Sequence, residues 1–264
     1  MSVNIVKYSK KEHVGVVTLN SPEHGNVIDA SVAQELLDIC LRINQNDDIY
    51  LVVITGTGDK FCMGSELEYL TGTGISLKSA VNKLKGTDLK YEVASAIALI
   101  DKPVVAAING DALGQGLEIA LACDVRYASE NARFGFPVTA AGLMPMDGGT
   151  QRLPRLIGKG KALEMILSGD IIDSREALAI GLVSQVIPPQ ELLEKTMAFA
   201  NSMAAKAPIA MRYVKEAVNK GLDLTLDQGV RLEADLYFLI HTTVDRTEGI
   251  KAFQEKRKPQ FKGK

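Results

Sequence analysis

Two short, uninterrupted apolar runs constrain the fold of this 264-residue chain more than any other feature. They span residues 50–54 and 103–108, and a glycine-bearing turn follows each of them. Continuous apolar runs of this length are typical of strands that are buried on both faces of a sheet. We expect a third strand at 124–128, with helices between the strands. This alternation predicts an α/β fold with a parallel sheet and crossover helices.

The remaining pattern predicts a helix-rich second half. Strands are expected at 4–8 and 14–19 around a turn at 9–13, followed by a helix that Asp29 or Ser31 caps and that runs to about Arg42. A long helix is expected over 77–100. After Gly158 the pattern predicts one strand at 182–187 and helices at 160–168, 174–180, 190–219 with a break at Pro208, 225–240 and from 246. We expect a core over residues 1–200 and a helical region over 201–264.

Composition argues against several functions. Apolar residues make up 46% of the chain, charged residues 23%, and the net charge is −2, so neither nucleic-acid nor membrane binding is favoured as the main task. No apolar stretch reaches the roughly 18 residues of a membrane span, and the polar start lacks a signal-peptide pattern. Cys40, Cys62 and Cys123 lack metal-ligand spacing, so we expect reduced thiols, no metal and a cytoplasmic location. The basic residues after Lys251 form either a solvated end or a local anion site.

A glycine-bearing turn at 112–116 leads into a helix that carries Glu118. The first N–H groups of a helix point out of its end and can hold a developing oxyanion. A carboxylate one turn later can move a proton. Together these groups indicate an enzyme that acts on a carbonyl compound.

A second strand-to-helix turn follows the apolar run at 50–54 and carries Ser65. Ser65 could simply cap the next helix. If both turns belong to one sheet, however, they face each other at the carboxyl ends of its strands. The backbone N–H groups of Ser65 and Gln115 could then converge on one oxygen.

The chain resembles the enoyl-CoA hydratase/isomerase, or crotonase, superfamily over essentially its whole length. The resemblance rests on several motifs in order: 61–66, 108–120, 148–154, 177 with 181–183, and 248–257. It implies a crotonase-like ββα superhelix core, a C-terminal helical trimerisation region, and a homotrimer or dimer of trimers. It also implies that the substrate is an acyl-CoA thioester of fatty-acid or aromatic-acid metabolism, with no cofactor beyond the coenzyme A that the substrate carries.

The resemblance assigns the catalytic roles. The N–H groups of Ser65 and Gln115 would polarise the thioester carbonyl, although the family usually has glycine at the position of Gln115. Glu118 would be the first catalytic glutamate. The second should stand at position 138, where this chain has Val138, so the usual two-carboxylate mechanism cannot run unchanged.

Asp147 is the candidate for a replacement acid. Its other interpretation is the cap of a helix that begins near Gly149. The resemblance also implies a substrate-binding set near the two loops and the C-terminal helix, consisting of His24, Met63, Glu66, Leu67, Glu68, Gly114, Val138, Met144, Phe253 and Lys256.

We therefore expect hydration of an α,β-unsaturated acyl-CoA, or the reverse dehydration, by an enoyl-CoA hydratase-like lyase. The missing second glutamate favours an atypical, cyclic or conjugated, acyl group. The alternatives within the family are a double-bond isomerase and a decarboxylase or hydrolase. A protein that only binds acyl-CoA, or that associates with RNA, is the alternative of a different class, and the intact Glu118 argues against it.

Overall fold

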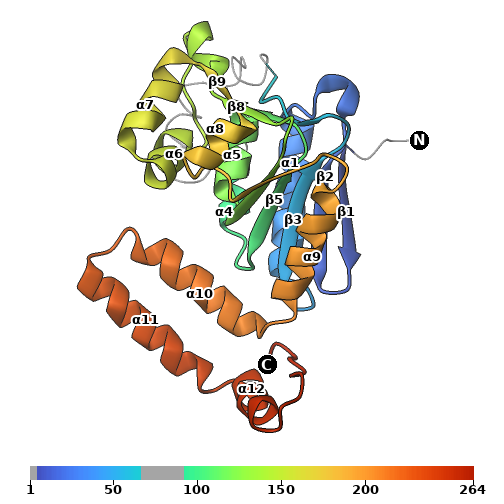
Figure 1. Cartoon of the computed structure of the whole chain (residues 1–264), viewed down its shortest axis with the longest axis vertical. Helices are drawn as coiled ribbons and strands as arrows, with labels where there is room; N and C mark the ends of the chain where they lie inside the picture. The colour runs from blue at the N-terminus through green and yellow to red at the C-terminus, as the bar shows by residue number, and fades with distance from the viewer. Residues whose placement is uncertain (1–4, 67–91) are drawn as a thin grey trace.

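A computed structural model describes residues 5–66 and 92–264 of the chain as an α/β core with helices appended (Figure 1). Its strands are β1 Val6–Lys11, β2 Val14–Leu19, β3 Leu51–Gly56, β4 Lys60–Cys62, β5 Val104–Ile108, β6 Asp111–Leu113, β7 Val125–Ser129, β8 Arg133–Gly135, β9 Ile171–Asp173 and β10 Gln185–Ile187. The helices that precede β10 are α1 Ala30–Asn44, α4 Val93–Ala98, α5 Gln115–Ala122, α6 Gly149–Ile157, α7 Lys159–Ser168 and α8 Ser174–Ala179. The later helices are α9 Leu192–Ala204, α10 Pro208–Gly221, α11 Leu226–Ile240 and α12 Val244–Gln254. Two short 3-10 turns, η1 Pro22–His24 and η2 Pro137–Ala141, complete the set.

The predicted parallel sheet is the larger of two sheets. Its strand order is β1-β2-β3-β5-β7-β10; β1 and β2 pair antiparallel, and the other neighbours pair parallel. Alternate residues of β3 face opposite sides, as strand geometry requires. Val52 and Ile54 join the core under α1 and α4, whereas Leu51 and Val53 pack towards α9 on the other face. Helices on both faces explain why β5 is apolar throughout and β3 is apolar from residue 51 to residue 54.

A second, four-stranded sheet has the order β4-β6-β8-β9. β4, β6 and β8 pair parallel, and β9 pairs antiparallel with β8. Each of these strands has three residues, too few for a periodic pattern, and the sequence did not predict them. The segments after β4, β6 and β8 therefore leave the same edge of this sheet.

Several local predictions need correction. The first strand continues to Lys11, so the turn that was expected at 9–13 shortens to Glu12 and His13, and Glu12 takes the left-handed φ of 52°. Asp29 caps α1, as one of the two candidates predicted, through bonds from Ser31 N and Val32 N. The described end of the predicted 77–100 helix is α4, and its earlier part lies outside the described residues.

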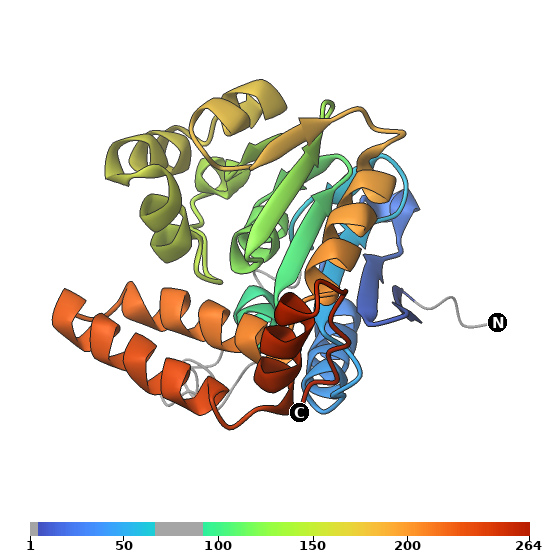
Figure 2. The ribbon, with the colours of Figure 1, turned by 60° about the horizontal axis from the view of Figure 1, so that its bottom comes forward.

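The C-terminal helices were predicted nearly to their ends. α10 and α11 lie side by side and project from the core (Figures 1 and 2), and α12 lies below them in the view of Figure 1. Pro208 begins α10, where a missing N–H costs no intrahelical bond. The tail after α12 is tied back, because the buried Asp245 carboxylate accepts bonds from Lys262 N and Gly263 N at 2.6 and 2.8 Å. Within the described residues no helix is both long and apolar enough to cross a membrane.

Candidate active site

Three loops that leave the same edge of the second sheet form a small pocket. β4 ends at Cys62, β6 at Leu113 and β8 at Gly135. The pocket is lined by Ser65, Gly114, Gln115, Glu118, Val138, Pro145 and Met146. The structure thus brings together both predicted donors, the predicted carboxylate and the valine of the altered position.

The first loop, which follows β4, is held extended by an isolated β-bridge between Ser65 and Ile28. Ile28 N donates to Gly64 O at 2.8 Å, and Glu66 N donates to Ile28 O at 3.0 Å. Because N–H groups alternate in direction along an extended chain, the N–H of Ser65 points away from Ile28. The loop packs directly on the next one, since a methyl group on Gly64 would lie 3.2 Å from the Leu113 carbonyl oxygen.

The second loop begins α5. Gly114, with φ +52° and ψ −123°, makes the turn between β6 and the helix, and Gln115 is the first helical residue. N–H groups of a first helical turn point out of the helix end. Ser65 Oγ donates a hydrogen bond to Gln115 Oε1, so the two residues predicted to supply the donors are in direct contact.

Glu118 lies one turn into α5 and is 2% exposed. Its Oε1 accepts hydrogen bonds from Asp147 N and Gly149 N, each at 2.8 Å. No donor in the described part of the chain reaches Oε2. Burial, together with the nearby Asp147 charge, raises the pKa of Glu118 to about 7, although the two amide bonds oppose the rise. A carboxyl with a pKa near neutrality can both take and return a proton.

Val138 lies in η2 and lines the pocket. A methyl group on Gly114 would lie 3.5 Å from Val138 Cγ1, so the valine side chain is close to the turn before α5. An apolar side chain can neither hold water nor transfer a proton. Among the described residues that line the pocket, Glu118 is the only carboxylate.

Asp147 is buried and does not line the pocket. The prediction that it caps the helix near Gly149 was wrong: Gly148 stands at that cap with a left-handed φ of +96°, and no side chain bonds there. Asp147 instead caps α4, accepting from Ala94 N at 2.6 Å and from Ser95 N at 3.1 Å. Because the chain turns at Gly148, the Asp147 side chain bonds to the start of α4 and not to the start of α6.

The Asp147 carboxylate has two further partners. Ser95 Oγ donates to Oδ1 at 3.0 Å, and Gln115 Nε2 donates to Oδ2 at 3.1 Å. Burial raises the pKa of Asp147, and these hydrogen bonds oppose the rise. A carboxylate with both oxygens bonded is suited to hold structure together. Its role as a replacement acid stays a prediction.

The predicted substrate residues near the first loop are partly assembled. Met63 N donates to Gly25 O at 3.0 Å, so the loop that carries His24 adjoins Met63. His24 and Glu66 are exposed, and the exposed fractions of Met63 and Met144 are 37% and 66%. The predicted Leu67 and Glu68 lie outside the described residues.

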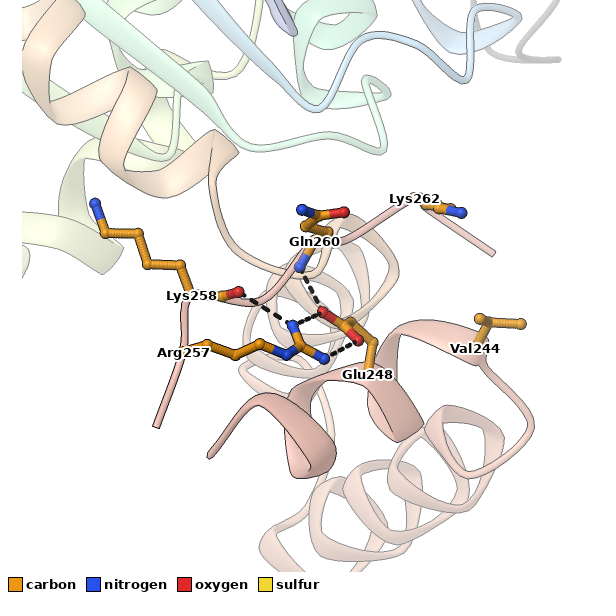
Figure 3. Close-up of a pocket in the computed structure, with 6 residues that line it drawn as sticks. All are labelled: Val244, Glu248, Arg257, Lys258, Gln260 and Lys262. Atoms are coloured by element: carbon orange, nitrogen blue, oxygen red, sulfur yellow. Dashed lines mark hydrogen bonds and ion pairs between the residues drawn. The ribbon is translucent and has the colours of Figure 1, made fainter. Parts of the chain in front are cut away.

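Phe253 and Lys256 are not brought to this site by the single chain. Both are exposed. Phe253 belongs to α12 and Lys256 follows that helix, and α12 lies far from α6 and α8 (Figure 1). The neighbouring surface pocket is basic, but its Arg257 forms a two-pronged ion pair with Glu248 at 2.6 and 2.9 Å (Figure 3). This pairing lowers the pKa of Glu248 to about 2 and offsets one of the positive charges that line this pocket.

Sequence reasoning missed the residues that support the site. Ala94 and Ser95 hold Asp147, and Pro145 lines the pocket. One signal was available: Glu92 stands at the start of α4 without forming a side-chain cap, so that helix end needs an acceptor from elsewhere. Which segment supplies it cannot be read from local sequence.

The comparisons agree with this geometry. The sequence profile of the family described as enoyl-CoA hydratase/isomerase matches residues 9–264. The chain is 43% identical to YngF of Bacillus subtilis over 100% of both chains, and 37% identical to the crotonyl-CoA hydratase of Syntrophomonas wolfei over 99% of each. The crystal structure of an enoyl-CoA hydratase from Bacillus anthracis superimposes with a TM-score of 0.91 at 38% identity, covering 99% of this chain and 100% of that one. These matches confirm the predicted crotonase fold and the predicted enoyl-CoA hydratase-like enzyme. The chain belongs to the enoyl-CoA hydratase/isomerase family.

Proposed function

We propose that this protein adds water to the double bond of an α,β-unsaturated acyl-CoA thioester, or catalyses the reverse dehydration. The observation that carries the proposal is the state of Glu118: one carboxylate oxygen is held by two amides, and the other has no donor among the described residues of a pocket shared with Ser65 and Gln115. The hydratase relative from Syntrophomonas wolfei supports the same reaction.

In the proposed reaction the thioester oxygen accepts hydrogen bonds from the backbone N–H groups of Ser65 and Gln115. Glu118 Oε2 takes a proton from water, the remaining hydroxide attacks the β-carbon, and the charge moves to the thioester oxygen as an enolate. The two amides stabilise that charge more than they stabilise the ground-state carbonyl. A single missing donor of this kind costs ~10²–10³ in rate.

The α-carbon then needs a proton, and Val138 cannot provide one. Glu118 is protonated at this stage and can return the proton it took, which balances the addition of one water with a single carboxyl group. Bulk water or Asp147 are the alternative donors. We also propose that the acyl group is atypical, cyclic or conjugated, because such enolates tolerate slower protonation and because Val138 offers an apolar wall.

Product masses in ¹⁸O-labelled water test the reaction. We expect a panel of enoyl-, dienoyl- and cyclic enoyl-CoA thioesters to include a substrate that gains one labelled water. An unchanged mass with a shifted retention time would instead mark an isomerase. Loss of carbon dioxide would mark a decarboxylase, and release of free coenzyme A a hydrolase. Binding of the whole panel without any product would contradict an enzyme.

The pH profile tests the protonation state of Glu118. Hydration needs the carboxylate, and the pKa of Glu118 is about 7. We therefore expect kcat/KM to be level above that pH and to fall about tenfold for each pH unit well below it. Initial rates between pH 5.5 and 9 measure this, with unfolding followed in parallel. A level profile down to pH 5.5 would exclude a single base with this pKa.

We also propose that the protein assembles as a homotrimer or a dimer of trimers through its C-terminal helices. Core packing was the other explanation for the apolar run at 236–240, but only Leu236 is buried, and the exposed fractions of Tyr237, Phe238 and Leu239 are 58%, 69% and 49%. Contiguous exposed apolar side chains support a contact between subunits. Such a contact is also the route by which Phe253 and Lys256 could reach a neighbouring subunit's substrate.

A further inference from the structure

We propose that the side chain of Gln115 is a positioning residue that sets the spacing between the oxyanion-hole amides and the Glu118 carboxylate. We call the hydrogen-bonded chain Ser65–Gln115–Asp147 the Gln115 bridge. This inference rests on the proposed function, because it assigns a task to the side chain of a residue whose backbone N–H is the proposed donor. The side chain itself does not touch the reacting atoms.

Each end of the carboxamide holds a different loop. Its Oε1 accepts from Ser65 Oγ, in the loop after β4. Its Nε2 donates to Asp147 Oδ2 at 3.1 Å, in the segment before α6. Gln115 is 4% exposed, so water competes weakly for these bonds and each one counts for more than it would at the surface.

The far end of the bridge is anchored to rigid structure. Asp147 accepts three further bonds from the start of α4, from Ala94 N, Ser95 N and Ser95 Oγ. The same residue donates its own N–H to Glu118 Oε1 at 2.8 Å. A shift of Asp147 would therefore move both the partner of Gln115 and the support of the catalytic carboxylate.

The chemistry of the bridge requires a carboxamide. One end must accept a hydrogen bond from a hydroxyl while the other donates one to a carboxylate, and glutamine does both. A glutamate would place a second negative charge against Asp147 in a buried site. An apolar side chain of the same length would fill the space and leave both loops unconnected.

Loss of the bridge should weaken the binding of the transition state more than the binding of the ground state. The loops would still bind the thioester, but the two amides and the carboxylate would no longer be held at one separation. A displacement of about 1 Å can cost ~10² in rate. We therefore expect loss of the bridge to lower kcat, because the best-aligned hydrogen bonds are those to the enolate.

Gln115→Met, Ser65→Ala and the double variant test the bridge. We expect Gln115→Met to lower kcat by ~10–100-fold with KM within about threefold. We expect Ser65→Ala to have a smaller effect in the same direction, and the double variant to match Gln115→Met, because both changes break one connection. Multiplicative losses in the double variant, or a loss confined to KM, would overturn the proposal.

Thr196→Val is the matched control. Thr196 is buried and donates to Leu192 O at 2.8 Å within α9, remote from the pocket. It should lose some thermal stability and keep its kcat. If Thr196→Val lowers kcat as much as Gln115→Met does, the effect is general destabilisation and the bridge has no special role.

Binding of acetoacetyl-CoA separates this inference from the proposed reaction. The enolate of this compound shares its negative charge with the thioester oxygen, and its ultraviolet absorbance reports binding without turnover. We expect Gln115→Met to weaken enolate binding ~10-fold or more. If the wild type hydrates none of the thioesters but binds the enolate more tightly than Gln115→Met does, the proposed reaction is wrong and the proposed role of the Gln115 bridge is supported. Equal affinity in wild type and variant would overturn the bridge.

Discussion

Glu118→Gln is expected to lower kcat for hydration by ~10³-fold or more, because the amide cannot take a proton from water. The variant should still bind the thioester, since the amide oxygen at Oε1 can accept the same bonds from Asp147 N and Gly149 N. KM should therefore change far less than kcat. Steady-state kinetics on the substrate found with labelled water measure both quantities.

The same substitution should stabilise the fold above pH 7. The folded pKa of Glu118 is about 7, whereas its ordinary value is 4.5, so the unfolded chain gives up its proton first as the pH rises. Stability is therefore lost between these two pH values and stays lost above them. A rise of this size corresponds to ~3 kcal/mol, and we expect Glu118→Gln to recover roughly 1–3 kcal/mol at pH 8 and little at pH 4.5.

Glu130→Gln serves as the control for both measurements. Glu130 is an exposed carboxylate in the turn between β7 and β8, outside the pocket. The exchange should leave kcat and unfolding free energy nearly unchanged. If Glu118→Gln keeps more than about a tenth of the wild-type kcat, Glu118 is not the base. If it destabilises the protein at pH 8, the folded protein holds the Glu118 carboxylate in its charged form, and burial does not raise its pKa.

The sequence predicted those parts of the fold whose signals are local. β5 and residues 51–54 of β3 are apolar because both faces of the sheet are covered, and Pro208 begins a helix where its missing N–H is tolerated. The three-residue strands of the second sheet carry no periodic signal, since their pairing comes from neighbours far along the chain. That sheet nevertheless positions the active site.

The residues of the candidate site likewise divide into those with a local sequence signal and those without one. Glu118 and the two donor residues follow from turn and helix geometry together with the family resemblance. The task of Asp147 does not, because its partners Ala94 and Ser95 precede it by 53 and 52 positions. Asp147 does cap a helix, as predicted, but that helix is α4 and not the one that begins near Gly149. The valine at position 138 is evident from the sequence, whereas the hydrogen bonds of Gln115 with Ser65 and Asp147 depend on the folded structure.

Gly116→Ala is expected to damage both the fold and the catalytic geometry. An added methyl group on Gly116 would lie 2.1 Å from the Cys62 carbonyl oxygen and 2.8 Å from the Cys62 carbonyl carbon. Both are backbone atoms of β4, so no side-chain rotation can relieve the overlap. α5 would have to move away from β4 by roughly an ångström, and this contact sets the distance between the two oxyanion loops.

We expect Gly116→Ala to lose at least ~3 kcal/mol of stability, or roughly 6–12 °C in Tm, and the folded fraction to lose ~10²-fold in kcat. Gly160→Ala is the matched control, because a methyl group at that position in α7 meets nothing within 4 Å. It should be neutral or stabilising by up to about 1 kcal/mol. Calorimetry and kinetics at 15 °C test both. A Gly116→Ala protein with wild-type Tm and kcat would mean that β4 and α5 can separate freely, and a fixed spacing between Ser65 and Gln115 could not then be the basis of catalysis.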